Sequence, residues 1–285
     1  MGSIIHRVAT AGDQLGRGYM HTGSKAIKRC VSVAGIDPNL VGMLINTGVY
    51  TDDYIQEPAF SALLQGKTKM GSSPGPGGML SYDLHVGGGG MIMAFRILNG
   101  YLQSGRIESG LVVAGDTVPE DSKQEGHQCS EGAGAVLLVK GEPDMGFKRF
   151  KQDTYSQYSR DFNSYTNYID GDLKTFINQS DKYLEHCIIC VKESVSHFLL
   201  DEQLQVNDID LIISSQSPVG FAVKIDQLYG ESGIVVIEGE RELYSAGIAF
   251  ALESAMKSGQ FSNAKRILFV SVGAGITVNL ALYEG

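Results

Sequence analysis

The side chains best suited to nucleophilic chemistry in this sequence are its four cysteines, Cys30, Cys129, Cys187 and Cys190. A cysteine becomes a nucleophile when a nearby base or positive charge favours its thiolate. Cys129 follows His127 by two residues, so this pair is the candidate for such a nucleophile. Cys187 and Cys190 have the spacing of a redox or metal pair, but they lie in an apolar helical stretch with no second pair nearby. A buried structural role is favoured for them.

Two glycine-containing segments have features of anion-binding sites. Consecutive backbone amides at a helix start attract phosphates and oxyanions, and Gly87 to Gly90 would supply them. The alternative, which we favour, is a turn in which small residues simply permit the backbone path. Gly18 to Lys25 nearly spells a phosphate-binding loop, but it ends Gly-Ser-Lys where that motif requires Gly-Lys. A helix start capped by Thr22 or Ser24 is the preferred interpretation.

An internal repeat predicts the elements that position these residues. The segments 94–117 and 249–272 each contain a helix with apolar residues at three- and four-residue spacing. Each helix closes with Ser-Gly, which suits the left-handed position after a helix end, and an apolar strand follows. Gly-Ala-Gly, at 132–134 and at 273–275, then leads into a further apolar strand, and we interpret both triplets as turns.

The repeat extends further towards the start of each half. In 25–48 and in 187–216 a helical stretch runs into an apolar strand. We therefore predict two similar α/β halves, residues 1–145 and 146–285. Strands that are apolar on both faces predict helices on both sides of each sheet. The polar segment 142–176 shows no clear period and is interpreted as a surface excursion or lid.

Composition limits the classes of function. The chain has 285 residues, of which 43% are hydrophobic and 19% charged, so it can bury a substantial core. The formal net charge is -9 and no basic run is present, which argues against a nucleic-acid partner. No basic region followed by an apolar stretch opens the sequence, and no apolar run approaches the ~18 residues that span a membrane. A cytoplasmic protein without membrane contact is expected.

Five segments, in the same order along the chain, resemble the β-ketoacyl-acyl-carrier-protein synthase III family of condensing enzymes. They are INTGVYTDDYIQEPAFSALLQ, YDLHVGGGGMIMAF, CSEGAGAVLLV, NDIDLIISSQSP and VSVGAGITVNLALYEG. The resemblance implies the thiolase fold, an α/β fold with a five-layered αβαβα core made of two pseudo-symmetric halves. It also implies a dimer in which each acyl pocket is lined partly by the neighbouring subunit.

The chemistry of this family needs a cysteine, a histidine and an asparagine. The cysteine takes the acyl group at a helix N-terminus, and the other two assist decarboxylation and stabilise the enolate. Carried over position by position, these residues fall on Gly88, Ser215 and Glu242. The resemblance therefore implies a degenerate member with no catalytic residue at these positions. The backbone amides of Gly88 and Ala274 could still form an oxyanion hole.

The comparison with the family's pattern has further implications. It places Cys129 away from the active centre, and it makes His85 a core or interface residue. The path from Ile4 to Lys25 is short, which implies a truncated coenzyme A entrance, and no tryptophan is available to stack an adenine. A carboxylate at Glu242 would repel an enolate, so a salt bridge to Arg241 or to an interface partner is its expected role.

Three functions remain open from the sequence. The leading hypothesis is a non-catalytic subunit that pairs with an active homologous condensing enzyme in fatty-acid-derived, polyketide or quinolone-like biosynthesis. The second is an acyltransferase or acyl-thioester hydrolase that works without a cysteine nucleophile. The third is a homodimeric acyl-binding module. Acyl-CoA or acyl carrier protein is the expected contact, and no cofactor or metal is expected.

Overall fold

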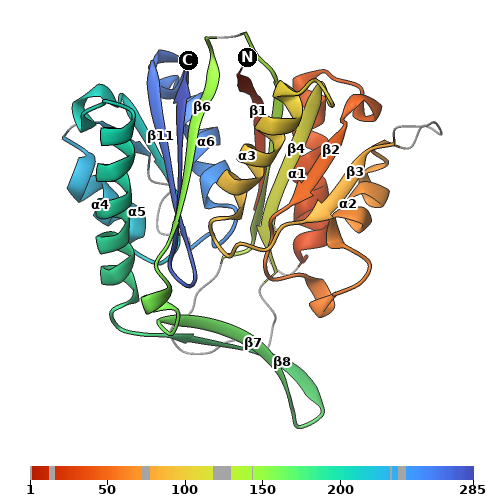
Figure 1. Cartoon of the computed structure of the whole chain (residues 1–285). Helices are drawn as coiled ribbons and strands as arrows, with labels where there is room; N and C mark the ends of the chain where they lie inside the picture. The colour runs from red at the N-terminus through yellow and green to blue at the C-terminus, as the bar shows by residue number, and fades with distance from the viewer. Residues whose placement is uncertain are drawn as a thin grey trace.

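The computed structural model describes residues 2–12, 17–71, 78–117, 130–142, 144–231, 233–236 and 242–285. Within these ranges the chain forms two five-stranded sheets and a two-stranded hairpin (Figure 1). The first sheet contains β1 (Ser3–Ala11), β2 (Met43–Asn46), β3 (Leu80–Asp83), β4 (Ser109–Asp116) and β5 (Gly132–Lys140). The second contains β6 (Gly146–Thr154), β9 (Leu211–Ser214), β10 (Ile234–Val236), β11 (Arg266–Gly273) and β12 (Thr277–Glu284).

The two sheets have the same topology. Their strand orders are β1-β5-β4-β2-β3 and β6-β12-β11-β9-β10. In each sheet the first two pairs are antiparallel and the last two are parallel. The second sheet therefore repeats the first, strand for strand.

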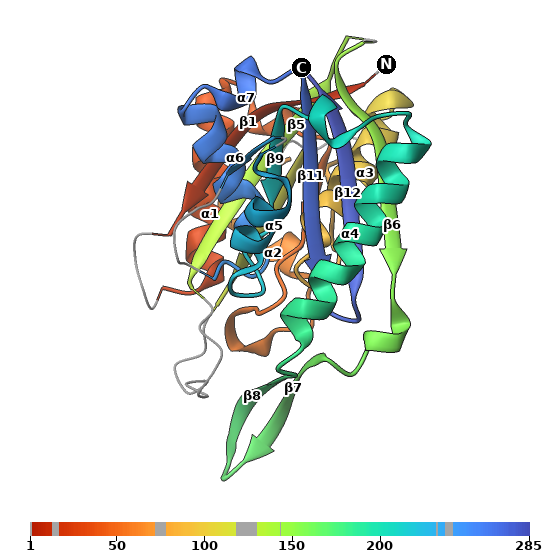
Figure 2. The ribbon, with the colours of Figure 1, turned by 90° about the vertical axis from the view of Figure 1, so that its left-hand side faces the viewer.

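Helices separate the sheets and cover their outer faces (Figure 2). The central pair is α3 (Gly90–Gln103) and α6 (Gly247–Lys257), which pack with both sheets in one hydrophobic core. The helices α1 (Tyr19–Ala34) and α2 (Phe60–Thr68) cover the first sheet, and α4 (Tyr183–Asp201) and α5 (Phe221–Tyr229) cover the second. These are the five layers of the predicted αβαβα core.

Shorter elements complete the described chain. They are the helix α7 (Gln260–Asn263), the hairpin strands β7 (Phe162–Ile169) and β8 (Asp172–Gln179), and the 3-10 turns η1 (Pro38–Leu40), η2 (Asp52–Tyr54), η3 (Ser156–Tyr158) and η4 (Val206–Asp208). None of the helices in the described ranges has the length and apolar character needed to cross a membrane.

The repeated helix ends form as the sequence predicts. The central helices stop at Ser104 and Ser258, and the glycines that follow have φ values of 68° and 78°. Only glycine adopts this left-handed conformation without a steric cost, so Ser-Gly ends both helices at equivalent positions.

The interpretation of both Gly-Ala-Gly segments as turns is wrong for the first copy. Residues 132–134 lie inside β5, whereas Gly273 ends β11 and a turn follows it. A Cβ on Gly134 would collide with the Ala249 Cβ of α6. The first triplet therefore allows the central helix to approach the sheet closely, which is a packing role.

The interpretation of 142–176 as a surface excursion or lid is wrong for its first part, which contains β6, the edge strand of the second sheet. The rest forms most of the β7–β8 hairpin, which is a largely exposed excursion. Strand β6 reads GFKRFKQDT, and its charged residues hide the strand signal because the edge faces solvent on one side. The beginning of β6 at Gly146 agrees with the division at 145, which stays a prediction.

Helix α1 begins earlier than predicted, and neither Thr22 nor Ser24 caps it. Both hydroxyls lie within the helix and donate to backbone carbonyls one turn earlier. The first amides, of Tyr19 and Met20, donate instead to the carboxylate of Asp52, which is distant in sequence. Because that carboxylate occupies the helix start, the segment does not present these amides to a phosphate.

A buried carboxylate joins the two halves. Asp116, at the end of β4, is 2% exposed. Its Oδ1 accepts from the amides of Val49 and Tyr50 at 3.0 and 3.1 Å. Its Oδ2 accepts from the amide and hydroxyl of Ser245, just before α6, at 2.9 and 2.6 Å. Burial raises the pKa of Asp116, and these hydrogen bonds oppose that shift by stabilising the ionised form.

Asp116→Ala is therefore expected to lower the free energy of unfolding by about 3–5 kcal/mol, because it leaves buried donors of both halves unpaired. Urea unfolding followed by circular dichroism measures the change. Asp172→Ala, at an exposed position of β8, is the matched control and should stay within about 0.5 kcal/mol of wild type. A loss below about 1 kcal/mol for Asp116→Ala would contradict the proposed link.

Candidate functional site

The site predicted from the resemblance lies at the N-terminus of α3. Residues 84–89 connect β3 to this helix, at the carboxyl ends of the parallel strands β2, β3 and β4. A helix start carries partial positive charge, which is the setting in which a thiolate or an oxyanion is stabilised. Gly88 stands there and is buried.

Backbone atoms close over Gly88. A Cβ at this position would lie 3.0 Å from the carbonyl oxygen of Val272 and 3.1 Å from that of Tyr244. The Tyr244 ring would follow at 3.9 Å. A side chain at position 88 therefore requires these two segments to move, and glycine fits because it has none.

The two turns with the predicted oxyanion amides are in contact. A Cβ on Gly87, whose φ is 54°, would lie 3.3 Å from the amide nitrogen of Ala274. A Cβ on Gly273 would lie 3.5 Å from the amide nitrogen of Gly89. The structure thus brings together the segments of Gly88 and Ala274, which are far apart in sequence, while an oxyanion hole between them stays a prediction.

The other two predicted positions belong to one chain of hydrogen bonds. Ser215 is 2% exposed, and its hydroxyl donates to the carbonyl of Ser217 at 3.3 Å. The Ser217 hydroxyl donates in turn to Oε1 of Glu242 at 3.1 Å. Burial raises the pKa of Glu242, and the Ser217 hydrogen bond partly opposes this. The expected partner of Glu242, Arg241, lies outside the described residues.

An aromatic cluster that sequence reasoning missed lies beside Gly88. It consists of Tyr50, Phe162, Tyr183 and Tyr244. Phe162 stacks on Tyr244 and on Tyr183, with ring centroids 6.0 and 5.3 Å apart. A Cβ on Gly87 would lie 3.4 Å from the Tyr244 hydroxyl, so the cluster packs directly against the glycine turn. No local pattern predicts it, because its members come from four separate segments.

Two buried polar side chains also lie beside the start of α3. Ser271 and Asn279 face each other across β11 and β12. Within the described part of the chain, neither the Ser271 hydroxyl nor the Asn279 amide has a hydrogen-bond partner. A Cβ on Gly89 would collide with the Asn279 Nδ2. An asparagine in the otherwise apolar run VNLALY was the available sequence signal.

The structure places some of the cysteine and histidine candidates. Cys187 and Cys190 are buried in α4, as predicted, and burial raises both thiol pKa values to about 12, which favours the expected structural role. His85 is exposed rather than part of the core. Cys129 and His127 lie outside the described residues, and their candidacy stays a prediction.

Comparison with known protein sequences finds relatives that share one name. No family model matches the chain. It is 23% identical over 267 residues to the β-ketoacyl-acyl-carrier-protein synthase III of Rickettsia massiliae, which covers 90% of this chain and 81% of the relative. The protein of the same name from Rickettsia bellii is 24% identical over 272 residues, with 92% and 83% covered.

Solved structures agree on the fold. A variant of OleA from Xanthomonas campestris superposes with a TM-score of 0.81 at 16% identity, over 100% of this chain and 99% of that one. The 3-oxoacyl-acyl-carrier-protein synthase III of Aquifex aeolicus gives 0.81 at 15% identity, with 100% of both chains covered. The thiolase fold is thereby confirmed, and the chain is a relative of the β-ketoacyl-acyl-carrier-protein synthase III proteins.

Proposed function

We propose that this chain is a non-catalytic subunit that pairs with an active homologous condensing enzyme in fatty-acid-derived, polyketide or quinolone-like biosynthesis. The observation that carries the proposal is the closure over Gly88. The position that resembles the family's acyl-accepting cysteine has no side chain, and the carbonyls of Val272 and Tyr244 lie 3.0 and 3.1 Å from where a Cβ would stand.

Within the described part of the chain, the contacts of Ser215, Glu242 and Tyr244 favour structural roles for these residues. The Ser215 hydroxyl donates to a peptide carbonyl, which cannot act as a general base for it. Glu242 is buried with a raised pKa, so its proton is retained more readily than in water. The Tyr244 ring packs against the turn itself. These features support structural roles for Ser215, Glu242 and Tyr244.

An open sheet edge supports the pairing. Strand β3 ends the first sheet and is bonded there to β2 alone among the described strands. Leu80 on this strand is 47% exposed, and Tyr82 is half-buried beside Tyr101 of α3. An edge strand with apolar side chains tends to find a partner. Helix α3 carries an open hollow of about 410 Å³, which Tyr101 lines together with Met93, Arg96, Ile97, Gly100, Ser104 and Arg106.

The hairpin extends the proposed interface. Figures 1 and 2 show β7 and β8 projecting beyond the body of the molecule. Strand β7 reads FNSYTNYI and has no charged residue, although most of it is exposed, including Tyr168 at 65%. Near the turn of the hairpin the Tyr54 hydroxyl of η2 donates to the carbonyl of Leu173 at 3.4 Å. An uncharged, tyrosine-rich surface suits contact with another protein.

The first prediction is that the isolated protein forms no stable thioester with acyl-CoA, because Gly88 has no nucleophilic side chain. Intact mass spectrometry after incubation with a panel of acyl-CoAs measures adduct formation, and the partner condensing enzyme serves as the positive control. One stoichiometric adduct that disappears in Cys129→Ala would instead identify Cys129 as the nucleophile. Turnover of acyl-CoA without an adduct would favour the hydrolase or acyltransferase alternative.

The second prediction tests Glu242 as a structural residue. A carboxyl whose pKa is raised on folding contributes stability that is fully present below its unfolded pKa, about 4.3, and is lost as pH rises through the folded pKa. Glu242→Gln keeps an acceptor for Ser217 and has no charge to bury. We expect it to be about 1 kcal/mol more stable than wild type at pH 7.5, with the difference shrinking towards pH 4.

Urea unfolding at several pH values measures this difference for Glu242→Gln. Glu193→Gln, at an exposed position of α4, is the matched control and should show no such trend. A variant that is destabilised at pH 7.5, or a difference that does not change with pH, would show that Glu242 is held in the ionised form.

The third prediction concerns the partner. Co-expression with a homologous condensing enzyme encoded beside this chain should give a stable one-to-one complex, in which the partner is more soluble or more active. Tyr82→Lys should weaken the complex, because it places an unpaired charge in the proposed interface at a cost of several kcal/mol. Size-exclusion chromatography and a condensation assay on the partner are the measurements.

Tyr158→Lys provides the matched control for the interface. Tyr158 is also half-buried, but it lies on η3, which packs with the core of the second sheet. This variant should leave the complex intact. A partner that is equally soluble, equally active and unbound in the presence of this chain would eliminate the subunit proposal in favour of the stand-alone functions.

A further inference from the structure

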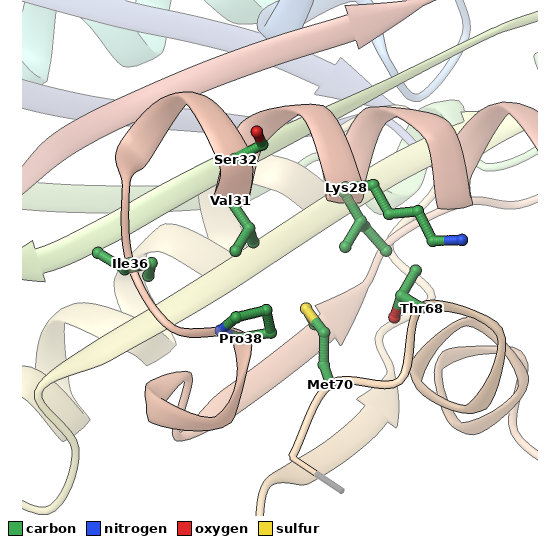
Figure 3. Close-up of a pocket in the computed structure, with 8 residues that line it drawn as sticks. Lys28, Val31, Ser32, Ile36, Pro38, Thr68 and Met70 are labelled. Carbon is green, nitrogen blue, oxygen red and sulfur yellow. The ribbon is translucent and has the colours of Figure 1, made fainter.

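We propose that a pocket between α1 and α2 binds a short aliphatic carboxylate, an unbranched acid of about six carbons. The pocket lies in the outer helical layer, between α1, the turn η1 and the end of α2 (Figure 3). The first sheet separates it from Gly88, because α1 and α2 pack on one face of that sheet and α3 on the other. It is therefore a second site, independent of the proposed pairing.

The walls of the pocket are aliphatic. Ile27 and Val31 come from α1, Ile36 from the segment that follows it, and Met70 from the end of α2. Ile27, Val31 and Met70 are 0%, 4% and 2% exposed, so most of their surface is already covered by the core. No aromatic ring lines the cavity, which favours an aliphatic chain over a planar ligand.

The volume limits the size of the ligand. The cavity measures about 190 Å³. A dry cavity of about 150 Å³ accepts a six-carbon ring such as benzene, whereas sites for cofactors and drug-sized molecules occupy about 300–1,000 Å³. A chain of about six carbons matches this space, and a nucleotide does not.

The charge at the mouth selects the head group. Lys28 lines the pocket and forms no ion pair or hydrogen bond within the described part of the chain. Figure 3 shows its side chain at one end of the pocket, near Thr68 and pointing away from Pro38 and Ile36. Lys28 is exposed, and it is the one charged residue among those that line the pocket in the described part of the chain. A carboxylate complements this charge, and an ammonium group does not.

The head group is recognised by charge rather than by a hydroxyl. The Thr68 hydroxyl donates to the carbonyl of Leu64 at 2.7 Å, so its proton is already engaged. Lys28 lies on the exposed side of α1 and can reach an anion at the mouth without losing another partner. The apolar chain would then lie against half-buried Ile36 and exposed Pro38, above the buried side chains of Val31 and Met70, and so leave water.

Titration of the full-length protein with hexanoate tests the proposal. The protein carries 13C-methyl-labelled methionine, and the Met70 methyl signal, assigned with Met70→Leu, reports on the pocket. We expect hexanoate to shift this signal in a saturable manner at millimolar concentration. Hexylamine and 1-hexanol should bind at least fivefold more weakly, because neither has the carboxylate.

Matched variants separate binding in the pocket from a general effect of charge. Lys28→Glu should weaken hexanoate at least fivefold. Lys192→Glu makes the same change at an exposed position of α4 and should bind like wild type. The proposal is overturned by an absent or unsaturable shift, by equal binding of hexylamine, or by unchanged binding in Lys28→Glu.

Discussion

The fold depends most on the buried carboxylate of Asp116. A single side chain accepts hydrogen bonds from the loop after β2 in the first half and from Ser245 in the second. Because it is 2% exposed, no water can replace those bonds without opening the core. By holding Ser245, it also holds the neighbouring Tyr244 over the Gly88 turn. The Asp116 carboxylate therefore both connects the two halves and holds Tyr244 against the Gly88 turn.

The close packing around Gly88 and the stability of the fold depend on different interactions, so both can be present in one protein. The central core consists of aliphatic and aromatic side chains of α3, α6 and both sheets, and it does not involve residue 88. A glycine at the start of α3 is therefore compatible with the packing of the rest of that helix. The exposed edge of β3 and the exposed, uncharged strand β7 are features that lower solubility unless a partner covers them. This contrast underlies the proposed subunit role.

The predictable parts of the fold are those with a local cause. Periodic apolar residues gave the central helices, and Ser-Gly ended both of them because the left-handed position favours glycine. Prediction failed where a tertiary contact replaced the local rule. Helix α1 is capped by Asp52 from a distant turn, and β6 is a strand because β12 lies beside it, although its own residues are mostly polar or charged.

Residue types and local spacing account for the repeated order of elements, the glycine at position 88, and the burial of Cys187 and Cys190. Each of these follows from residue type or from spacing within one segment. Tertiary packing, by contrast, places Tyr244 and Phe162 beside Gly88 and forms the aliphatic pocket between α1 and α2. Such contacts join residues that are far apart along the chain, so no local pattern encodes them. Their geometry exists only after the sheets and helices have packed.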